Sequence, residues 1–338
     1  MKSKSQRRSD VMGERKLRVS ILDDFEKLAD TVPAYETLRS RAEVTILRER
    51  LDTAENLERN LRDSECLLLM RERTSFTAEA LNLLPNLRFI SQTGRTSKHL
   101  DMDHIASRRI PVSGTPSDNG GPTKEIAVGL IVGLMRRIAE VDRRMRSEIW
   151  PPIPGQLIEG KTLGVLGFGR IGKEVARIMV AFQMRVLAYS RTLTDAQASE
   201  VGAERASMET LLRESDIVTI HVPLNANTRG LIGEKQLQMM KRGALVVNTS
   251  RGPIISEQAL IGALKSGHLG GAGLDVYDRE PLPMDHPLRS FDNTILLSHR
   301  GYATVEILRQ RYQQAMENIL AFLEGNPTNL INPEVLGR

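Results

Sequence analysis

The sequence predicts an α/β protein made of two doubly wound parallel-sheet domains. Its 338 residues exceed the usual size of one domain and fit two. Two successive series of short apolar runs alternate with amphipathic stretches, which is the pattern of parallel β–α units. The second series begins with an apolar run that leads into a glycine-rich turn at 167–172 and then into a helical pattern.

The first series predicts a small domain of its own. Its expected strands lie at 17–22, 43–47, 66–70, 88–92 and 110–113. The segment that follows, 114–122, is rich in Gly, Pro, Ser and Asn, so we place a hinge there. A long helical pattern then runs from about 123 to about 147.

The second series predicts strands near 162–167, 184–189, 216–221, 243–248, 271–275 and 293–297. A final helical pattern, roughly 303–324, follows the last of them, and its position suggests that the chain returns to the first domain. The predicted division is a flexible basic tail at 1–16, a first domain at 17–118 and 303–338, and a second domain at 119–302. Domains joined by two chain segments can close on a ligand, so we expect the active site in the cleft between them.

Composition and charge narrow the possible functions. The 40% hydrophobic and 26% charged residues are typical of a soluble globular protein, and no run of about 18 apolar residues could span a membrane. The start of the chain is basic and polar and lacks the apolar stretch of a signal peptide. The formal net charge of +5 lies largely in this tail, and no basic stripe with interleaved aromatic residues follows it. We therefore expect a small anionic ligand, and neither a nucleic acid nor a membrane as partner.

Cysteine usage indicates a reducing compartment. Cys66 is the single cysteine, lies in an apolar run and has no partner for a disulfide. We expect a buried thiol in a cytoplasmic protein, in preference to a catalytic thiol. No cluster of Cys and His residues has the spacing of a metal site, so we expect no metal.

The glycine-rich turn predicts a dinucleotide-binding site. Gly167, Gly169 and Gly172 form a Gly-x-Gly-x-x-Gly pattern between a predicted strand and a predicted helix. The first glycine permits the tight turn, the second lets backbone N–H groups approach the pyrophosphate, and the third lets the helix pack closely on its strand. Arg170 and Ile171 lie in the same turn, where the helix N-terminus supplies partial positive charge.

The end of the next predicted strand favours NADP(H), with NAD(H) still possible. An acidic residue about 20 positions beyond the glycines usually binds the adenosine ribose and selects NAD. This chain has Ser190, Arg191 and Thr192 there instead. A guanidinium can pair with a 2′-phosphate and hydroxyls can donate to it, whereas a carboxylate would repel it. The alternative is that Arg191 is a solvated loop residue.

Three further predicted strands end in residues that could carry chemistry. These are Arg251 after 243–248, Glu280 after 271–275 and His299 after 293–297. Ligands of doubly wound sheets bind at the carboxyl ends of the strands. Taken singly, each residue also has an ordinary explanation, as a loop cation, a surface carboxylate and a packed imidazole.

Taken together, the motifs resemble the D-isomer-specific 2-hydroxyacid dehydrogenase family, with the glyoxylate and hydroxypyruvate reductases as the nearest pattern. The segments that carry the resemblance, in order, are the glycine turn, His221-Val222-Pro223-Leu224 with Thr228, Asn248-Thr249-Ser250-Arg251-Gly252, Gly271–Val276 with Glu280-Pro281, and His299. The resemblance covers essentially the whole chain after the tail. It implies a flavodoxin-like substrate domain, a Rossmann dinucleotide-binding domain and hydride transfer between nicotinamide C4 and C2 of a 2-oxo or 2-hydroxy acid.

The resemblance and the chemistry assign roles to the catalytic residues. His299 is the expected acid and base, because an imidazolium can supply the proton that the carbonyl oxygen needs near neutral pH. Glu280 would favour the charged imidazole and fix its orientation. Arg251 would hold the substrate carboxylate and polarise the carbonyl.

The same resemblance implies the binding residues. Asp275 would contact the nicotinamide end, and the remaining expected cofactor contacts are His221, Val222, Pro223, Thr228, Thr249, Ser250 and Gly301. The substrate carboxylate would lie over the backbone N–H groups of a loop that contains Gly94, Arg95 and Thr96, with Arg71 as a further candidate.

The chain departs from the family pattern in two places. Thr96 stands where the family often has a second glycine, so the substrate loop could differ in geometry. Ser298 and Arg300 flank the histidine where the family commonly has proline and a small apolar residue. A cation at Arg300 would favour a substrate with a second anionic group; the alternative is that Arg300 points away.

The favoured interpretation is an NADP(H)-preferring 2-oxoacid reductase that acts as a homodimer, the dimer being implied by the resemblance alone. The alternatives are a dinucleotide-sensing protein akin to corepressor relatives and a phosphite-type dehydrogenase. Formate dehydrogenases of this fold use glutamine where Glu280 stands, which disfavours that activity.

Overall fold

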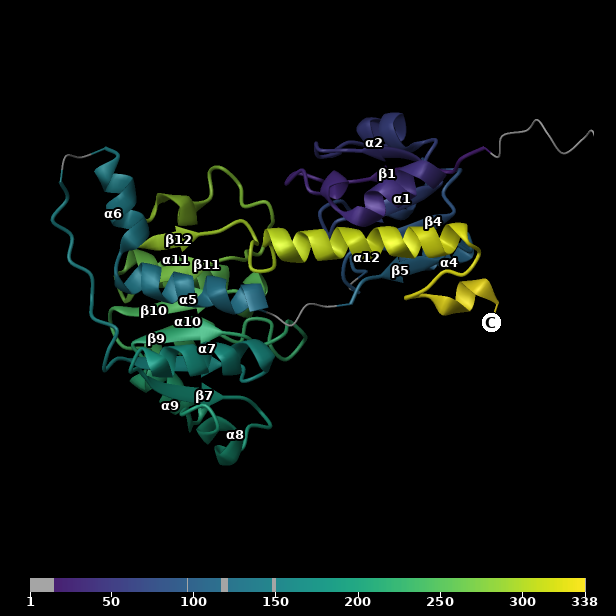
Figure 1. The fold of residues 1–338 in the computed structure, drawn as a ribbon. Coiled ribbons are helices and arrows are strands. Elements are labelled where there is room, and N and C mark those ends of the chain that lie inside the picture. Colours follow the sequence, from purple (N-terminus) through teal and green to yellow (C-terminus); the bar gives the residue numbers. More distant parts are fainter. Residues whose placement is uncertain (1–14, 96, 117–120, 148–149, 338) are drawn as a thin grey trace, which may run out of the picture. The chain divides into compact units, whose positions relative to one another are not determined.

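The computed structural model describes residues 15–95, 97–116, 121–147 and 150–337. The chain divides into two compact units, one of Met1–Asp118 with Thr304–Arg338 and one of Asn119–Ala303 (Figure 1). Each unit contains its own parallel sheet, so the predicted fold class is confirmed.

The first unit contains a five-stranded sheet in the order β2-β1-β3-β4-β5. All of its strand pairs are parallel. The strands are β1 (Arg18–Ile21), β2 (Glu43–Ile46), β3 (Cys66–Leu69), β4 (Phe89–Gln92) and β5 (Val112–Gly114). This strand order is that of flavodoxin-like domains, as expected. The Cys66 thiol is fully buried in β3, and burial raises its pKa to about 12, as expected of a packed and unreactive thiol.

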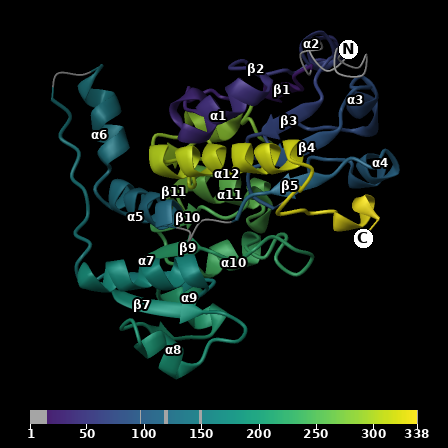
Figure 2. The ribbon, with the colours of Figure 1, turned by 45° about the vertical axis from the view of Figure 1, so that its right-hand side comes forward.

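Five helices accompany this sheet in the described residues: α1 (Pro33–Arg41), α2 (Ala54–Leu61), α3 (Ala78–Asn82), α4 (Met102–Ser107) and α12 (Val305–Leu323). Although α12 comes last in the sequence, it packs against α1, β3, β4 and β5 (Figure 2). The rings of Phe89 in β4 and Phe322 in α12 stack with centroids 4.4 Å apart. The apolar face of α12 therefore completes the core of the first unit.

The second unit contains a seven-stranded parallel sheet in the order β12-β11-β10-β9-β6-β7-β8. The strands are β6 (Thr162–Leu166), β7 (Arg185–Tyr189), β8 (Glu204–Arg205), β9 (Ile217–Ile220), β10 (Ala244–Asn248), β11 (Leu269–Leu274) and β12 (Thr294–Leu296). The chain winds outward from β6 in one direction and then from β9 in the other. The reversal between β6 and β9 is the switch point at which doubly wound sheets bind their ligands.

Helices cover both faces of this sheet. On one face lie α5 (Gly121–Met135) and α7 (Arg170–Ala181), and on the other lie α9 (Met208–Glu214), α10 (Glu234–Met239) and α11 (Glu257–Lys265). The strands alternate accordingly, since Leu245 and Val247 of β10 join the first apolar core and Val246 joins the second. A short helix, α8 (Asp195–Ser199), precedes β8.

One expectation for this unit was wrong, and one strand was missed. The helix expected over 123–147 is broken into α5 and α6 (Ile138–Met145), because Arg137 takes a left-handed conformation with a φ of 52°. No glycine or proline marks this break in the sequence. The strand β8 was not predicted, because its two residues are charged and exposed and form no apolar run.

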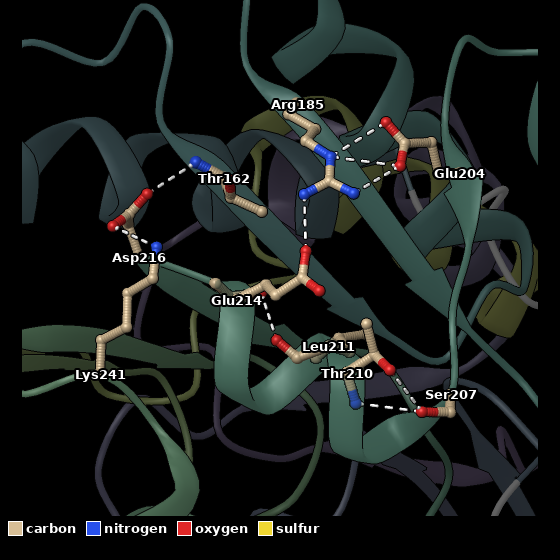
Figure 3. A network of polar contacts seen from close by, with 10 residues as sticks. Thr162, Arg185, Glu204, Ser207, Thr210, Leu211, Glu214, Asp216 and Lys241 are labelled. Carbon is tan, nitrogen blue, oxygen red and sulfur yellow. Dashed lines mark hydrogen bonds and ion pairs between the residues drawn. The ribbon is translucent and has the colours of Figure 1, made fainter.

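A polar network connects the amino ends of several strands of this sheet (Figure 3). It lies opposite the carboxyl ends, after which Arg251, Glu280 and His299 follow. Arg185 at the start of β7 pairs with Glu204 in β8 at 2.7 Å and with Glu214 at the end of α9 at 2.6 Å. Asp216 accepts the N–H of Thr162 at 2.8 Å and pairs with Lys241 at 2.9 Å. These contacts fix where β6, β7 and β9 begin.

None of the helices among the described residues is long and apolar enough to cross a membrane.

Candidate active site

The predicted catalytic residues of the second unit lie along one edge of its sheet. The strands are parallel and closely in register at this edge, with Leu274 of β11 opposite both Asn248 of β10 and Leu296 of β12. Arg251, Glu280 and His299 follow β10, β11 and β12, so three neighbouring strand ends carry the three residues. Their order along the edge could not be read from the sequence, because it depends on strand order.

His299 and Glu280 form a direct pair. The imidazole Nδ1 donates to the Glu280 Oε2 at 2.7 Å, and the other carboxylate oxygen accepts the N–H of Tyr277 at 3.0 Å. Burial opposes ionisation of Glu280, but the hydrogen bond and charge of His299 outweigh it and hold the Glu280 pKa below its usual value. The His299 Nε2 makes no hydrogen bond within the described residues, and the side chain is 28% exposed. One ring nitrogen is therefore held and the other is available.

A buried carboxylate holds the loop that carries His299. Asp275 at the end of β11 accepts the backbone N–H groups of Arg300 at 2.6 Å and Gly301 at 2.7 Å. Burial raises the pKa of Asp275 above its usual value, although these two N–H groups oppose the shift. His299 itself has a φ of 55°, an uncommon conformation for a residue other than glycine, and the Asp275 contacts fix the residues directly after it. Both oxygens of Asp275 thus hold the backbone of the histidine loop.

The Arg251 loop is held by the residues around it. The Asn248 side chain donates to the Arg251 carbonyl at 2.9 Å and accepts the Ser250 N–H at 3.0 Å, while the Ser250 hydroxyl donates to the Ile220 carbonyl at 2.9 Å. The Arg251 Nη1 donates to the Ser250 carbonyl at 2.7 Å. The positive charge of Arg251 also lowers the Glu280 pKa, so the guanidinium lies within electrostatic range of this carboxylate. Thr249, also predicted to contact the cofactor, is buried.

The glycine turn fits a dinucleotide. Gly167 has a φ of 101°, and a Cβ there would lie 2.7 Å from the Val222 backbone nitrogen; a Cβ on Gly172 would lie 2.1 Å from the Gly167 oxygen. Both positions therefore require glycine. A Cβ on Gly169 would meet nothing within 4 Å, and no side chain caps the α7 N-terminus that begins at Arg170. The first N–H groups of α7, which include those of Arg170 and Ile171, lie beside open space, as phosphate binding requires.

The segment predicted to choose between the dinucleotides lies next to this turn. The Gly167 N–H donates to the carbonyl of Tyr189 at 2.8 Å, and Ser190, Arg191 and Thr192 follow directly. Arg191 and Thr192 are exposed, and Arg191 forms no ion pair with any residue that the structure describes. The guanidinium is thus free to pair with an anion beside the glycine turn.

The other residues predicted to contact the cofactor follow β9 or flank His299. The His221 Nε2 lies 3.0 Å from the Thr219 hydroxyl, and burial lowers the His221 pKa to about 4, so this imidazole is neutral at neutral pH. Thr228 closes the same loop, because its hydroxyl donates to the Pro223 carbonyl at 2.6 Å. Gly301 lies against Asp275, since a Cβ there would be 2.9 Å from the Asp275 Oδ2.

The predicted substrate residues lie at the carboxyl ends of β3 and β4 in the first unit. The Arg71 N–H donates to Thr93 Oγ1 at 2.8 Å, and the Arg71 Nη1 would lie 2.8 Å from a Cβ on Gly94, so the guanidinium covers this glycine. The Gly94 N–H donates to Thr115 Oγ1 at 2.8 Å, so it is engaged within the protein and is a poor candidate for binding a carboxylate.

The rest of this loop is only partly described. The Arg95 N–H makes no hydrogen bond in the described chain, whereas the Arg95 side chain reaches the Leu330 carbonyl at 3.3 Å. Arg95 could therefore contribute its backbone N–H rather than its guanidinium. Thr96 lies outside the described residues.

Two residues that support the histidine loop were not predicted from the sequence. Tyr277 joins the ends of two strands, because its hydroxyl donates to the carbonyls of Leu297 at 2.8 Å and Leu274 at 3.2 Å. Thr123, in α5, donates to the Gly301 carbonyl at 2.9 Å. Neither residue is marked by a motif, and only the folded chain brings it to the histidine loop. Asn248 was within a quoted motif, but its part in holding the arginine loop was not foreseen.

A comparison with known families agrees with this geometry. Residues 128–301 match the NAD-binding domain of the D-isomer specific 2-hydroxyacid dehydrogenases. The chain belongs to this family. It is therefore an oxidoreductase that acts on 2-hydroxy acids and uses a nicotinamide cofactor.

Similar proteins extend over most of the chain. A glyoxylate reductase from Thermofilum pendens is 39% identical over 290 residues, which are 83% of this chain and 85% of that protein. A glyoxylate reductase from Aeropyrum pernix is 38% identical over 320 residues, 90% of this chain and 88% of that one. The crystal structure of a phosphoglycerate oxidoreductase from Vibrio cholerae O395 has a TM-score of 0.84 at 30% identity, and covers 91% of this chain and 99% of its own.

Two alanine substitutions in the glycine turn should separate binding from folding. Gly169→Ala fills space open to a phosphate and keeps an allowed backbone, so we expect an unchanged melting temperature and at least about tenfold weaker cofactor binding. Gly172→Ala creates a backbone clash and should lower the melting temperature. Fluorescence titration with NADPH and thermal unfolding measure the two effects. Wild-type affinity in Gly169→Ala would exclude this turn as the phosphate site.

Proposed function

We propose that the protein is an NADP(H)-preferring reductase of small 2-oxo acids such as glyoxylate and hydroxypyruvate. The pair formed by His299 and Glu280 carries the proposal, because its 2.7 Å contact holds one ring nitrogen and leaves the other able to exchange a proton. Glyoxylate reductases among its relatives, including those from Thermofilum pendens and Aeropyrum pernix, support this class of substrate.

The proposed reduction converts the C2 carbonyl of the acid into CH–OH. A reduced nicotinamide, when bound at the glycine turn, would supply the hydride for C2. Protonated His299 donates its Nε2 proton to the carbonyl oxygen as negative charge develops there, and becomes a neutral imidazole. In the opposite direction, neutral His299 accepts the proton of the hydroxyl. Reduction therefore requires the protonated ring and should slow as the pH rises, whereas oxidation should slow as the pH falls.

Glu280 and Arg251 prepare the site for this proton transfer. The lowered pKa of Glu280 keeps its carboxylate charged into the acidic range, and that charge stabilises the imidazolium of His299. The Arg251 guanidinium uses one nitrogen for the Ser250 carbonyl, which leaves N–H groups for the substrate carboxylate and carbonyl.

The proposed preference for NADP(H) over NAD(H) rests on Arg191. Its exposed guanidinium lies at the end of β7, next to the glycine turn, and would pair with the 2′-phosphate of NADP(H). No acidic residue stands between Ser190 and Leu193 to bind a free ribose hydroxyl.

Steady-state assays of His299 variants test the catalytic assignment. We expect the wild type to reduce at least one of four 2-oxo acids with NADPH. These are glyoxylate, hydroxypyruvate, pyruvate and phosphohydroxypyruvate. His299→Ala should lose about 100-fold to 10,000-fold in kcat and retain NADPH affinity, because only proton transfer is removed. His268→Ala is the matched control, since His268 is bonded to the Leu237 carbonyl away from the three catalytic strand ends.

Three results would contradict this assignment. Tight NADPH binding without turnover of any of these acids would favour a dinucleotide sensor, and NADP⁺-dependent oxidation of phosphite alone would favour a phosphite-type dehydrogenase. Wild-type kcat in His299→Ala would remove this residue from the reaction.

Substitution of Arg191 tests the cofactor assignment. Arg191→Ser should raise the KM for NADPH by about 10-fold to 100-fold, the loss of a charged hydrogen bond, and leave the KM for NADH unchanged. Arg177→Ser, at an exposed position on α7, controls for a general loss of positive charge. Equal kcat/KM for the two cofactors in the wild type would refute the role given to Arg191.

We also propose that the protein is a homodimer. Four large apolar side chains, Ile138, Met145, Trp150 and Leu157, are exposed in α6 and the segment after it, and a second copy would cover them. Light scattering should give twice the chain mass, and Ile138→Asp with Leu157→Asp should give the monomer mass. A monomeric wild type at micromolar concentration would refute the proposal.

A further inference from the structure

A second histidine and carboxylate pair lies beside the proposed site. The His286 Nε2 is 3.1 Å from the Glu257 Oε1, and the two side chains are only 12% and 29% exposed. Glu257 is the first residue of α11, which follows the Arg251 loop, and His286 ends the loop that carries Glu280. The pair therefore connects the segments after β10 and β11 that present two of the three catalytic residues.

Hydrogen bonds assign the protons of this second imidazole. The His286 Nδ1 accepts the backbone N–H of Leu288 at 3.3 Å, so it carries no proton, and the Nε2 proton is left to donate to Glu257. His299 differs, because its Nδ1 faces Glu280 and its Nε2 is open. Since both nitrogens of His286 are engaged inside the protein, His286 joins two segments and cannot serve as a proton donor to substrate.

The segments that this pair joins also touch next to the catalytic residues. A Cβ on Gly252 would lie 2.0 Å from the Tyr277 carbonyl carbon, so the two backbones are in direct contact. Tyr277 is the residue whose N–H binds Glu280 at 3.0 Å. Asn248, Gly252, Glu257, Tyr277 and Asp278 contribute to a cavity of about 20 Å³ between the segments, enough for about one water. A shift of one segment over the other would therefore displace Glu280.

Other charges near the pair are few in the described structure. Asp278 lies close to both partners, and burial with the negative charge of Glu257 raises its pKa. The positive charge of Arg229 acts in the opposite direction. Glu257 thus accepts the Nε2 proton of His286 and also lies within electrostatic range of Asp278.

We propose that His286 and Glu257 form a clasp that sets the position of Glu280 against His299. Both are positioning residues, since they act through the contact with each other and through the segments they join. The effect on catalysis rests on the proposed function, whereas the effect on the His299 environment does not.

Three substitutions separate the clasp from general stability. His286→Asn keeps an oxygen that can accept the Leu288 N–H but is too short to reach Glu257, and Glu257→Ala removes the acceptor. Glu257→Gln keeps an acceptor oxygen and is the conservative variant. His268→Asn is the control for loss of an imidazole elsewhere in the unit.

We expect His286→Asn and Glu257→Ala each to lower kcat about tenfold, with little change in NADPH affinity, because Glu280 is misplaced and the dinucleotide turn is intact. The double variant should lose no more than either single one. In each of the two single variants, His286→Asn and Glu257→Ala, the high-pH limb of kcat/KM for reduction should move to lower pH. The reason is that a misplaced Glu280 carboxylate stabilises the imidazolium of His299 less. Glu257→Gln should restore both quantities.

Side-chain ¹⁵N NMR of the histidines tests the clasp without turnover. The His299 signal, assigned by its loss in His299→Gln, should titrate at lower pH in His286→Asn and Glu257→Ala, and as in the wild type in Glu257→Gln. Lower melting temperatures with an unchanged His299 titration would overturn the clasp. An inactive wild type whose variants show the NMR shift would refute the proposed function alone.

Discussion

The proposed chemistry depends on the 2.7 Å contact between His299 and Glu280, which two different strands must bring together. A carboxylate at hydrogen-bond distance orients an imidazole and favours its charged form, but only while both loops hold their places. Several groups hold these two loops in position. Asp275 binds the backbone after His299, the Tyr277 N–H binds Glu280, and the Tyr277 hydroxyl bridges the ends of β11 and β12.

The dinucleotide end of the site depends on close backbone packing instead of side-chain contacts. Gly167 lies against the backbone after β9, and Gly172 against the carbonyl of Gly167. These approaches bring the α7 N-terminus to the switch point between β6 and β9, where its N–H groups are free of side-chain caps. Binding and proton transfer are thus supported by different parts of one sheet edge, and a substitution can damage one and leave the other intact.

The parts of the fold that could be predicted are those with a strong local signal. Each segment expected to form a strand does so. Strands such as β3, β6 and β10 are buried throughout and need continuous apolar residues, whereas the edge strand β2 alternates between exposed and partly buried positions. The break at Arg137 and the two-residue β8 have no such signal, since a left-handed arginine and a charged edge strand depend on their surroundings. The sequence also could not show that the Gly94 N–H, expected to bind the substrate carboxylate, is already bonded to Thr115, because Thr115 is distant in the sequence.

The sequence by itself determined which residues could carry the chemistry: a glycine turn, an arginine where NAD-binding domains have an acid, and a histidine, a glutamate and an arginine after three strands. Those identities follow from local chemistry and need no coordinates. Only the tertiary structure decided that β10, β11 and β12 are neighbours, that Asp275 holds the histidine loop, and that His286 reaches Glu257. The physical reason is that strand order and long-range hydrogen bonds arise from packing between segments far apart in the chain, which no local pattern encodes.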